Sequence, residues 1–133
     1  MSGAPDEFQV IAELFAPLAQ SYPGALGLTD DVALLTPDPD CETAVTMDAV
    51  VAGVHFLPDD PPDLVARKLM RVNLSDLASK GARPFAVMLA AAFPRGVDLA
   101  WLKCFAQGLA EDVAEFGVAL IGGDTVATPG PLT

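Results

Sequence analysis

Acidic residues recur in this sequence where a loop meets a helix or a strand. Carboxylates at such positions can take part in metal binding or catalysis. Asp30 and Asp31 come directly before the apolar stretch VALL, and Asp48 follows TAVTM. Asp76 lies within NLSDL, and Asp124 follows the apolar run VALI and two glycines. Because neighbouring strands of a sheet lie about 5 Å apart, carboxylates at several strand ends can converge on one small volume.

Carboxylates that converge in this way repel one another unless protons or metal ions offset their charge. Mg²⁺ takes oxygen ligands, keeps several of its waters and is commonly held by one or two carboxylates together with substrate phosphates. The glycines before Asp124 would let backbone N–H groups approach a phosphate. The pattern therefore predicts Asp124 as a metal ligand beside a triphosphate, in a site for phosphoryl transfer.

Each of these residues also has a simpler interpretation. An aspartate taken alone fits a helix cap, a turn or a solvated charge. Asp76 fits those roles least, because it lies within an apolar-periodic helix and has no evident capping role. Asn73, three residues earlier on the same face, is placed to orient it. His55 is the only histidine, and its strand-end position in GVHF leaves both a structural role and substrate contact open.

The composition limits the classes of partner. The chain has 133 residues, of which 52% are hydrophobic, and a formal net charge of -11. Those values predict one globular domain with much apolar surface to bury, some of it in an oligomer interface. The acidic excess repels nucleic acid and anionic membrane surfaces, so any phosphate chemistry must rely on bound cations. The sequence contains neither a P-loop motif nor a GxGxxG motif after a strand.

The cysteines and the apolar runs bear on localisation. Cys41 and Cys104 are far apart, with no CxxC motif and no neighbouring histidine, which predicts two free thiols in a reducing compartment. The start MSGAPDEF is acidic, and the longest apolar run, residues 85–93, is far shorter than the roughly 20 residues of a membrane span. We therefore expect a cytoplasmic protein.

Helical and strand-like patterns alternate along the chain. Apolar residues at helical spacing predict helices over residues 6–19, 61–82 and 98–117. Apolar or β-branched stretches predict strands over residues 32–36, 43–56, 85–93 and 118–121, the last of which enters a loop at the glycines. This order predicts an α/β (α+β) fold with a mixed sheet and helices packed on one face. The ending ATPGPLT has the pattern of a turn that enters another strand.

Four motifs occur together in a recognisable order: GLTDDVALL, TMDAVVAGVHF, ARKLMRVNLSDLASKGARP and LIGGDT. Together they resemble the amino-terminal domain of thiamine-monophosphate kinase. That family is similar in fold to aminoimidazole-ribotide synthetase, selenophosphate synthetase and the hydrogenase maturation factor HypE. The resemblance implies a mainly antiparallel sheet and a homodimer formed through the sheets. It also implies transfer of the ATP γ-phosphoryl group to thiamine monophosphate, giving thiamine diphosphate, with several Mg²⁺ ions.

The resemblance assigns roles to individual residues. Gly123 and Asp124 match an ATP contact, and His55 matches a contact to thiamine phosphate. The residues that match metal ligands are Asp31, Thr46, Asp48, Asp76 and Asp124.

The sequence departs from the family pattern at three places. Thr29 replaces a glycine of the family's GIGDD motif, and Met47 replaces a hydroxyl ligand with a thioether, which suits Mg²⁺ poorly. The family also has a second domain, whereas residues 1–133 are expected to form a single domain that stops before its last strands. Two rivals stay open: a related enzyme with another phosphate acceptor, and a non-catalytic dimerisation module derived from a truncated kinase.

Overall fold

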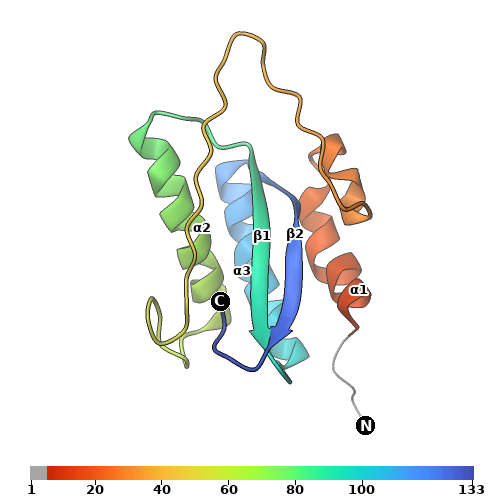
Figure 1. The fold of residues 1–133 in the computed structure, drawn as a ribbon, viewed down its shortest axis with the longest axis vertical. Coiled ribbons are helices and arrows are strands. Elements are labelled where there is room, and N and C mark those ends of the chain that lie inside the picture. Colours follow the sequence, from red (N-terminus) through yellow and green to blue (C-terminus); the bar gives the residue numbers. More distant parts are fainter. Residues whose placement is uncertain (1–5) are drawn as a thin grey trace.

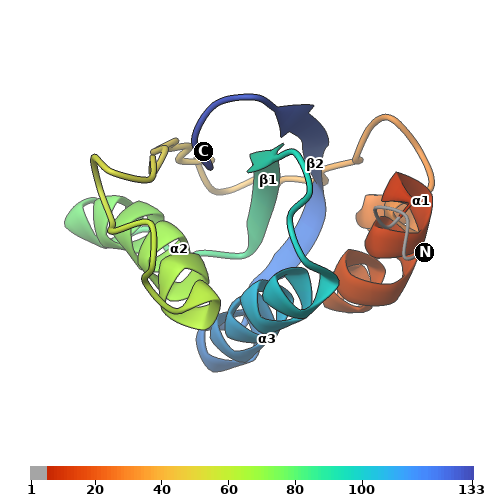
Figure 2. The same cartoon turned by 90° about the horizontal axis from the view of Figure 1, so that it is seen from below.

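The structure is a computed structural model and describes residues 6–133. Its regular core consists of two long helices and two strands in alternation. In chain order these are α2 (Pro62–Ser79), β1 (Ala86–Pro94), α3 (Leu99–Phe116) and β2 (Ala119–Thr128). The helices lie on one side of the two strands (Figures 1 and 2). The predicted combination of helices and strands, with the helices on one face, is confirmed.

Helix ends follow the residues that favour them. α2 begins at Pro62, where a proline is tolerated because the first N–H groups of a helix have no partner within it. α3 ends at Gly117, which has φ +64°, and the Gly117 N–H donates to the carbonyl of Val113. Asp98 occupies the N-cap position of α3, but its side chain makes no capping hydrogen bond. None of the helices in residues 6–133 is long and apolar enough to cross a membrane.

The two strands are parallel. Ala86 pairs with Ala119 at one end and Pro94 pairs with Thr128 at the other. The expectation of a mainly antiparallel sheet is therefore wrong for this pair. The reason is the connection: α3 crosses over between the strands and returns the chain in the same direction.

β2 continues through the glycines instead of ending at them. It runs to Thr128, and Asp124 lies inside the strand opposite Ala90 of β1. The prediction of a loop at LIGGDT is therefore wrong. The register shifts by one residue between Val87 and Met88, so that Ile121 is the extra residue of a bulge. Beyond the bulge, pairing continues through both glycines to Thr128.

The first predicted helix is a series of short helical segments. They are α1 (Glu7–Val10), the π-helical turn η1 (Ile11–Phe15) and the 3₁₀ turn η2 (Ala16–Ala19). A further 3₁₀ turn, η3 (Pro23–Leu28), follows beyond the predicted range. Pro17 lies at the start of η2, and its missing N–H prevents one continuous α-helix. Leu26, Gly27 and Leu28 all have positive φ, so the chain leaves η3 through a left-handed bend.

The predicted strands over 32–36 and 43–56 are wrong within the described residues. That part of the chain is extended or turned, with one isolated bridge between Ala52 and Phe56, and it forms the long arc of Figure 1. A strand needs a neighbour to pair with its backbone groups, and neither stretch has a continuous one here.

The end of the chain returns to the sheet. Thr133 and Ala92 of β1 exchange two backbone hydrogen bonds, at 2.7 and 3.1 Å, and the carbonyl of Leu132 accepts from the N–H of Ala52 at 2.9 Å. Residues 129–133 form no strand of their own, so the expected entry into another strand stays a prediction.

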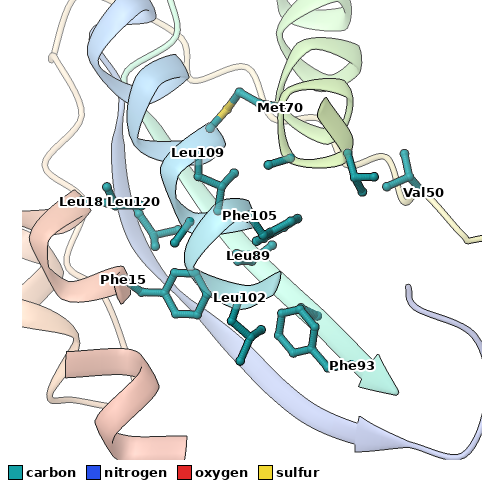
Figure 3. Close-up of a cluster of buried hydrophobic side chains, with 14 of the residues drawn as sticks. Phe15, Leu18, Val50, Met70, Leu89, Phe93, Leu102, Phe105, Leu109 and Leu120 are labelled. Atoms are coloured by element: carbon teal, nitrogen blue, oxygen red, sulfur yellow. The ribbon is translucent and has the colours of Figure 1, made fainter. Parts of the chain in front are cut away.

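The core lies between the helices and one face of the sheet. Leu89 and Phe93 of β1 pack with Phe105 of α3, and Phe15 and Met70 belong to the same cluster (Figure 3). Alternate residues of a strand point to opposite faces, so the other face of the sheet is not covered by the helices. Met88 and Val126 on that face are 68% and 51% exposed.

Candidate functional site

Two predicted ligands meet although they lie far apart in the sequence. Thr46 donates a hydrogen bond from its Oγ1 to Oδ2 of Asp76 over 3.2 Å. Thr46 is half-buried in the extended segment, and Asp76 is exposed on α2. A hydroxyl and a carboxylate are the oxygen ligands that Mg²⁺ accepts, so the chemistry of this pair fits that ion.

Asp48 lies beside the same helix because its main chain is held by Asn73. The N–H of Asp48 donates to Oδ1 of Asn73 at 2.7 Å, and Nδ2 of Asn73 donates to the carbonyl of Asp48 at 3.3 Å. The Nδ2 group also donates to the carbonyl of Leu69, one turn earlier, at 3.0 Å. The sequence predicts that Asn73 orients Asp76. In the structure its recorded bonds instead go to the main chain of Asp48 and of its own helix.

The other two predicted ligands lie on other elements. Asp31 is exposed in the segment after η3, and Asp124 is exposed in β2. Among residues 6–133, no three histidine, cysteine or acidic side chains are grouped closely enough to hold a metal ion. The structure thus joins Thr46 and Asp76, with the Asp48 main chain tied to the same helix. The full set of five ligands stays a prediction.

Gly123 has a structural role that explains part of the GGDT motif. Its φ is +146°, and a Cβ at this position would lie 1.8 Å from the carbonyl oxygen of Leu89. A Cβ on Gly122 would meet only Cε of Met88, at an ordinary 3.6 Å. The close approach of β1 therefore requires a glycine at position 123, independently of any contact that Gly123 makes with a nucleotide.

His55 is arranged as a hydrogen-bond donor. Its Nδ1 accepts the N–H of Val51 at 3.0 Å, so the neutral ring carries its proton on Nε2. The carbonyl of His55 accepts a hydrogen bond from the ammonium group of Lys68 on α2. The ring is exposed. An exposed Nε2–H can donate to a phosphate oxygen without disturbing the turn that holds the residue.

Two contacts near the site were missed by the sequence reasoning. Thr125 Oγ1 donates to Oε1 of Glu7 at 3.1 Å, which ties α1 to β2 next to Asp124. No spacing rule relates residues at the two ends of a chain. The second contact joins α2 to α3, where the fully buried Asp112 accepts from Nε and Nη2 of Arg71 at 2.9 and 2.8 Å.

The α2–α3 contact is a small network of charges. Arg67 lies 3.5 Å from Asp112 and also pairs with the exposed Glu111. The hydrogen bond to Asp112 raises the pKa of Arg71 above its ordinary value, against an opposing effect of desolvation, so Arg71 stays charged. The i, i+4 spacing of the two arginines was a signal for a charged helix face. It did not show that the partner acid would be buried.

Comparisons with known proteins identify the relatives of this chain. The family model described as AIR synthase related protein, N-terminal domain, matches residues 29–133. The chain is 53% identical over 128 residues to thiamine-monophosphate kinase of Caulobacter vibrioides, covering 96% of this chain and 36% of that protein. The chain thus spans just over a third of that relative's length.

Solved structures similar to this chain include thiamine-monophosphate kinases. The thiamine-monophosphate kinase of Stenotrophomonas maltophilia is 38% identical, with a TM-score of 0.71, over 78% of this chain and 33% of that one. A structure of AaThiL complexed with AMPPCP and TMP is 24% identical, with a TM-score of 0.61, over 64% of this chain and 27% of that one. The latter likeness shows the fold alone.

Proposed function

We propose a function from the premise that this chain belongs to the family of AIR synthase related proteins, as an N-terminal domain. In this proposal residues 1–133 form the Mg²⁺- and ATP-binding domain of a thiamine-monophosphate kinase, which makes thiamine diphosphate from thiamine monophosphate. The observation that carries it is the meeting of Thr46 with Asp76 on α2, beside Asp48. The thiamine-monophosphate kinases among its relatives supply the substrate class.

The residues of this chain then have separate tasks. Thr46, Asp48 and Asp76 would hold Mg²⁺ from the α2 side, and Asp31 and Asp124 would add oxygen ligands. The ion, when bound, neutralises phosphate charge and helps to align the reacting groups. Gly123 and Asp124 lie on exposed backbone of β2, where a nucleotide phosphate has access. The Nε2–H of His55 donates to the phosphate of thiamine monophosphate.

Asp124→Asn tests the nucleotide site. We expect Mg²⁺-dependent binding of a non-hydrolysable ATP analogue, measured by titration calorimetry, to weaken by more than about tenfold, because the amide removes a charged ligand. EDTA should abolish binding by the unsubstituted chain. Asp98→Asn makes the same charge change at an exposed helix start and should bind normally. Equal weakening in both variants, or binding that persists in EDTA, would contradict the assignment.

His55 can be tested with a pair of amides. Glutamine keeps an N–H group near the Nε2 position, whereas asparagine keeps only an acceptor for the Val51 N–H. We expect the dissociation constant for thiamine monophosphate, with Mg²⁺ and the ATP analogue present, to rise about tenfold for His55→Asn, which is the loss of one charge-assisted hydrogen bond. His55→Gln should lose less. Val54 is an exposed neighbour of His55. If Val54→Ala raises the dissociation constant as much as His55→Asn does, the loss comes from disturbance of the turn and not from removal of the Nε2–H donor.

The assembly and the location are part of the proposal. The uncovered face of the sheet carries exposed Met88 and Val126. Pairing of two copies would bury apolar surface there as long as Asp124, on the same face, stays open to the nucleotide. We propose a homodimer on this basis. Cys41 and Cys104 are free thiols, which suits a cytoplasmic enzyme.

A non-catalytic dimerisation module is the second candidate. The same apolar face supports it, as does the lack of a grouped set of three acidic side chains among the described residues. Failure of the unsubstituted chain to bind the Mg²⁺–nucleotide would favour this candidate over the kinase domain.

A further inference from the structure

The segment that carries Thr46 and Asp48 has little to hold it. Residues 43–50 form no regular strand, so no backbone ladder fixes their position. Val50 is buried in the core, but Asp48 and its neighbour Met47 are exposed. Asp48 and Asp76 also carry the same charge, which favours their separation. Apart from the single hydrogen bond between Thr46 and Asp76, another contact must keep this segment against α2.

The side chain of Asn73 supplies that contact. Its amide both accepts from the N–H and donates to the carbonyl of Asp48, at 2.7 and 3.3 Å. A neighbouring strand would pair with a residue in the same way, so the amide takes the place of the missing strand at this position. The further bond to the carbonyl of Leu69 fixes the rotamer of Asn73 on the helix. Among uncharged side chains of this length, only an amide offers a donor and an acceptor in one plane.

We propose that Asn73 is a positioning residue: it binds the Asp48 main chain to α2 so that the oxygen groups of Thr46, Asp48 and Asp76 stay within reach of one divalent cation. The inference rests on the proposed function, because it assumes that these groups bind a cation. It assigns Asn73 no direct contact with the metal or the substrate. Residues that orient metal ligands in this way commonly affect affinity by 10- to 100-fold when they are replaced.

Asn73→Ala is the direct test. Alanine is the stronger helix former, so α2 is not expected to lose helicity, which circular dichroism would check. We expect the dissociation constant for Mn²⁺, used alone as the probe and followed by electron paramagnetic resonance, to rise by about 10- to 100-fold. We also expect amide exchange of Asp48, followed by NMR, to become at least tenfold faster. Amides within α3 should keep their protection.

Ser79→Ala is the matched control. Ser79 is on the same helix, and its hydroxyl donates to the carbonyl of Asp76 at 2.7 Å, so the variant removes a polar contact without releasing the segment. It should bind Mn²⁺ as the unsubstituted chain does. Asn73→Leu, which keeps the branched shape and the number of side-chain heavy atoms, provides a second variant if Asn73→Ala does not fold.

The outcomes separate this inference from the proposed function. Unchanged Mn²⁺ binding by Asn73→Ala, or an equal loss in Ser79→Ala, would overturn the positioning role and leave the metal site intact. Failure of both Asn73 variants to fold would overturn it as well, because the residue would then support the whole domain. No Mn²⁺ binding by the unsubstituted chain would overturn the metal site itself, and the positioning role with it.

Discussion

Gly123→Ala is expected to lower the free energy of unfolding by about 3 kcal/mol or more. Losses of this size are typical of substitutions that force the backbone to move. The added Cβ would lie 1.8 Å from the carbonyl oxygen of Leu89 and 2.9 Å from its nitrogen, and these backbone atoms belong to the paired strand. A flexible side chain could give way, but the backbone of a paired strand packed on the core cannot. The φ of +146° adds strain for any residue with a Cβ.

The neighbouring glycine is the control for this prediction. Gly122→Ala places a methyl group 3.6 Å from the end of the Met88 side chain, so we expect a change within about 0.5 kcal/mol. Both variants can be compared by urea unfolding followed by circular dichroism. A similar loss in the two variants would mean that β1 and β2 do not approach each other as closely as described. The test needs no ligand, so it examines the fold independently of the proposed chemistry.

The elements that the sequence predicted well are those whose signals are local. α3 has an apolar stripe and a glycine at its end, and α2 begins at a proline, so each could be placed within a few residues. The failures concern pairing. Residues 32–36 have the composition of a strand, but a strand depends on a neighbour that composition does not specify. The direction of the sheet depended on the crossover through α3, which sequence order alone should have suggested.

In the candidate site too, residue types could be predicted from local signals, whereas contacts between distant segments could not. The types of residue could be chosen from their chemistry, and Thr46 and Asp76 do meet across 30 positions of sequence. The function of Asn73 could not be predicted, because a bond to the main chain of Asp48 leaves no trace in the spacing of side chains. Gly123 was assigned to a nucleotide from its motif, whereas the backbone of Leu89 already accounts for a glycine there.

Asp112→Ala is expected to lower the free energy of unfolding by about 2–3 kcal/mol, the range for hydrogen bonds to a charged group. Asp112 is fully buried and accepts two hydrogen bonds from Arg71, with Arg67 at 3.5 Å. Both arginines are partly exposed, so water can solvate them after the substitution. The expected loss of stability is therefore smaller than for a buried charge that is left without a partner. Thermal and urea unfolding would measure it.

Glu115→Ala provides the matched comparison, because Glu115 pairs with the same arginine from the surface. Its side chain is 56% exposed, and its oxygen lies 3.2 Å from Nη2 of Arg71. An exposed ion pair of this kind contributes less than about 1 kcal/mol and is screened by salt. We therefore expect a small effect that disappears in 1 M NaCl, whereas the loss from Asp112→Ala should persist. Equal losses, both removed by salt, would mean that Asp112 is open to solvent. In that case the contact between α3 and the helix that carries Asn73 and Asp76 would be weaker than the geometry indicates.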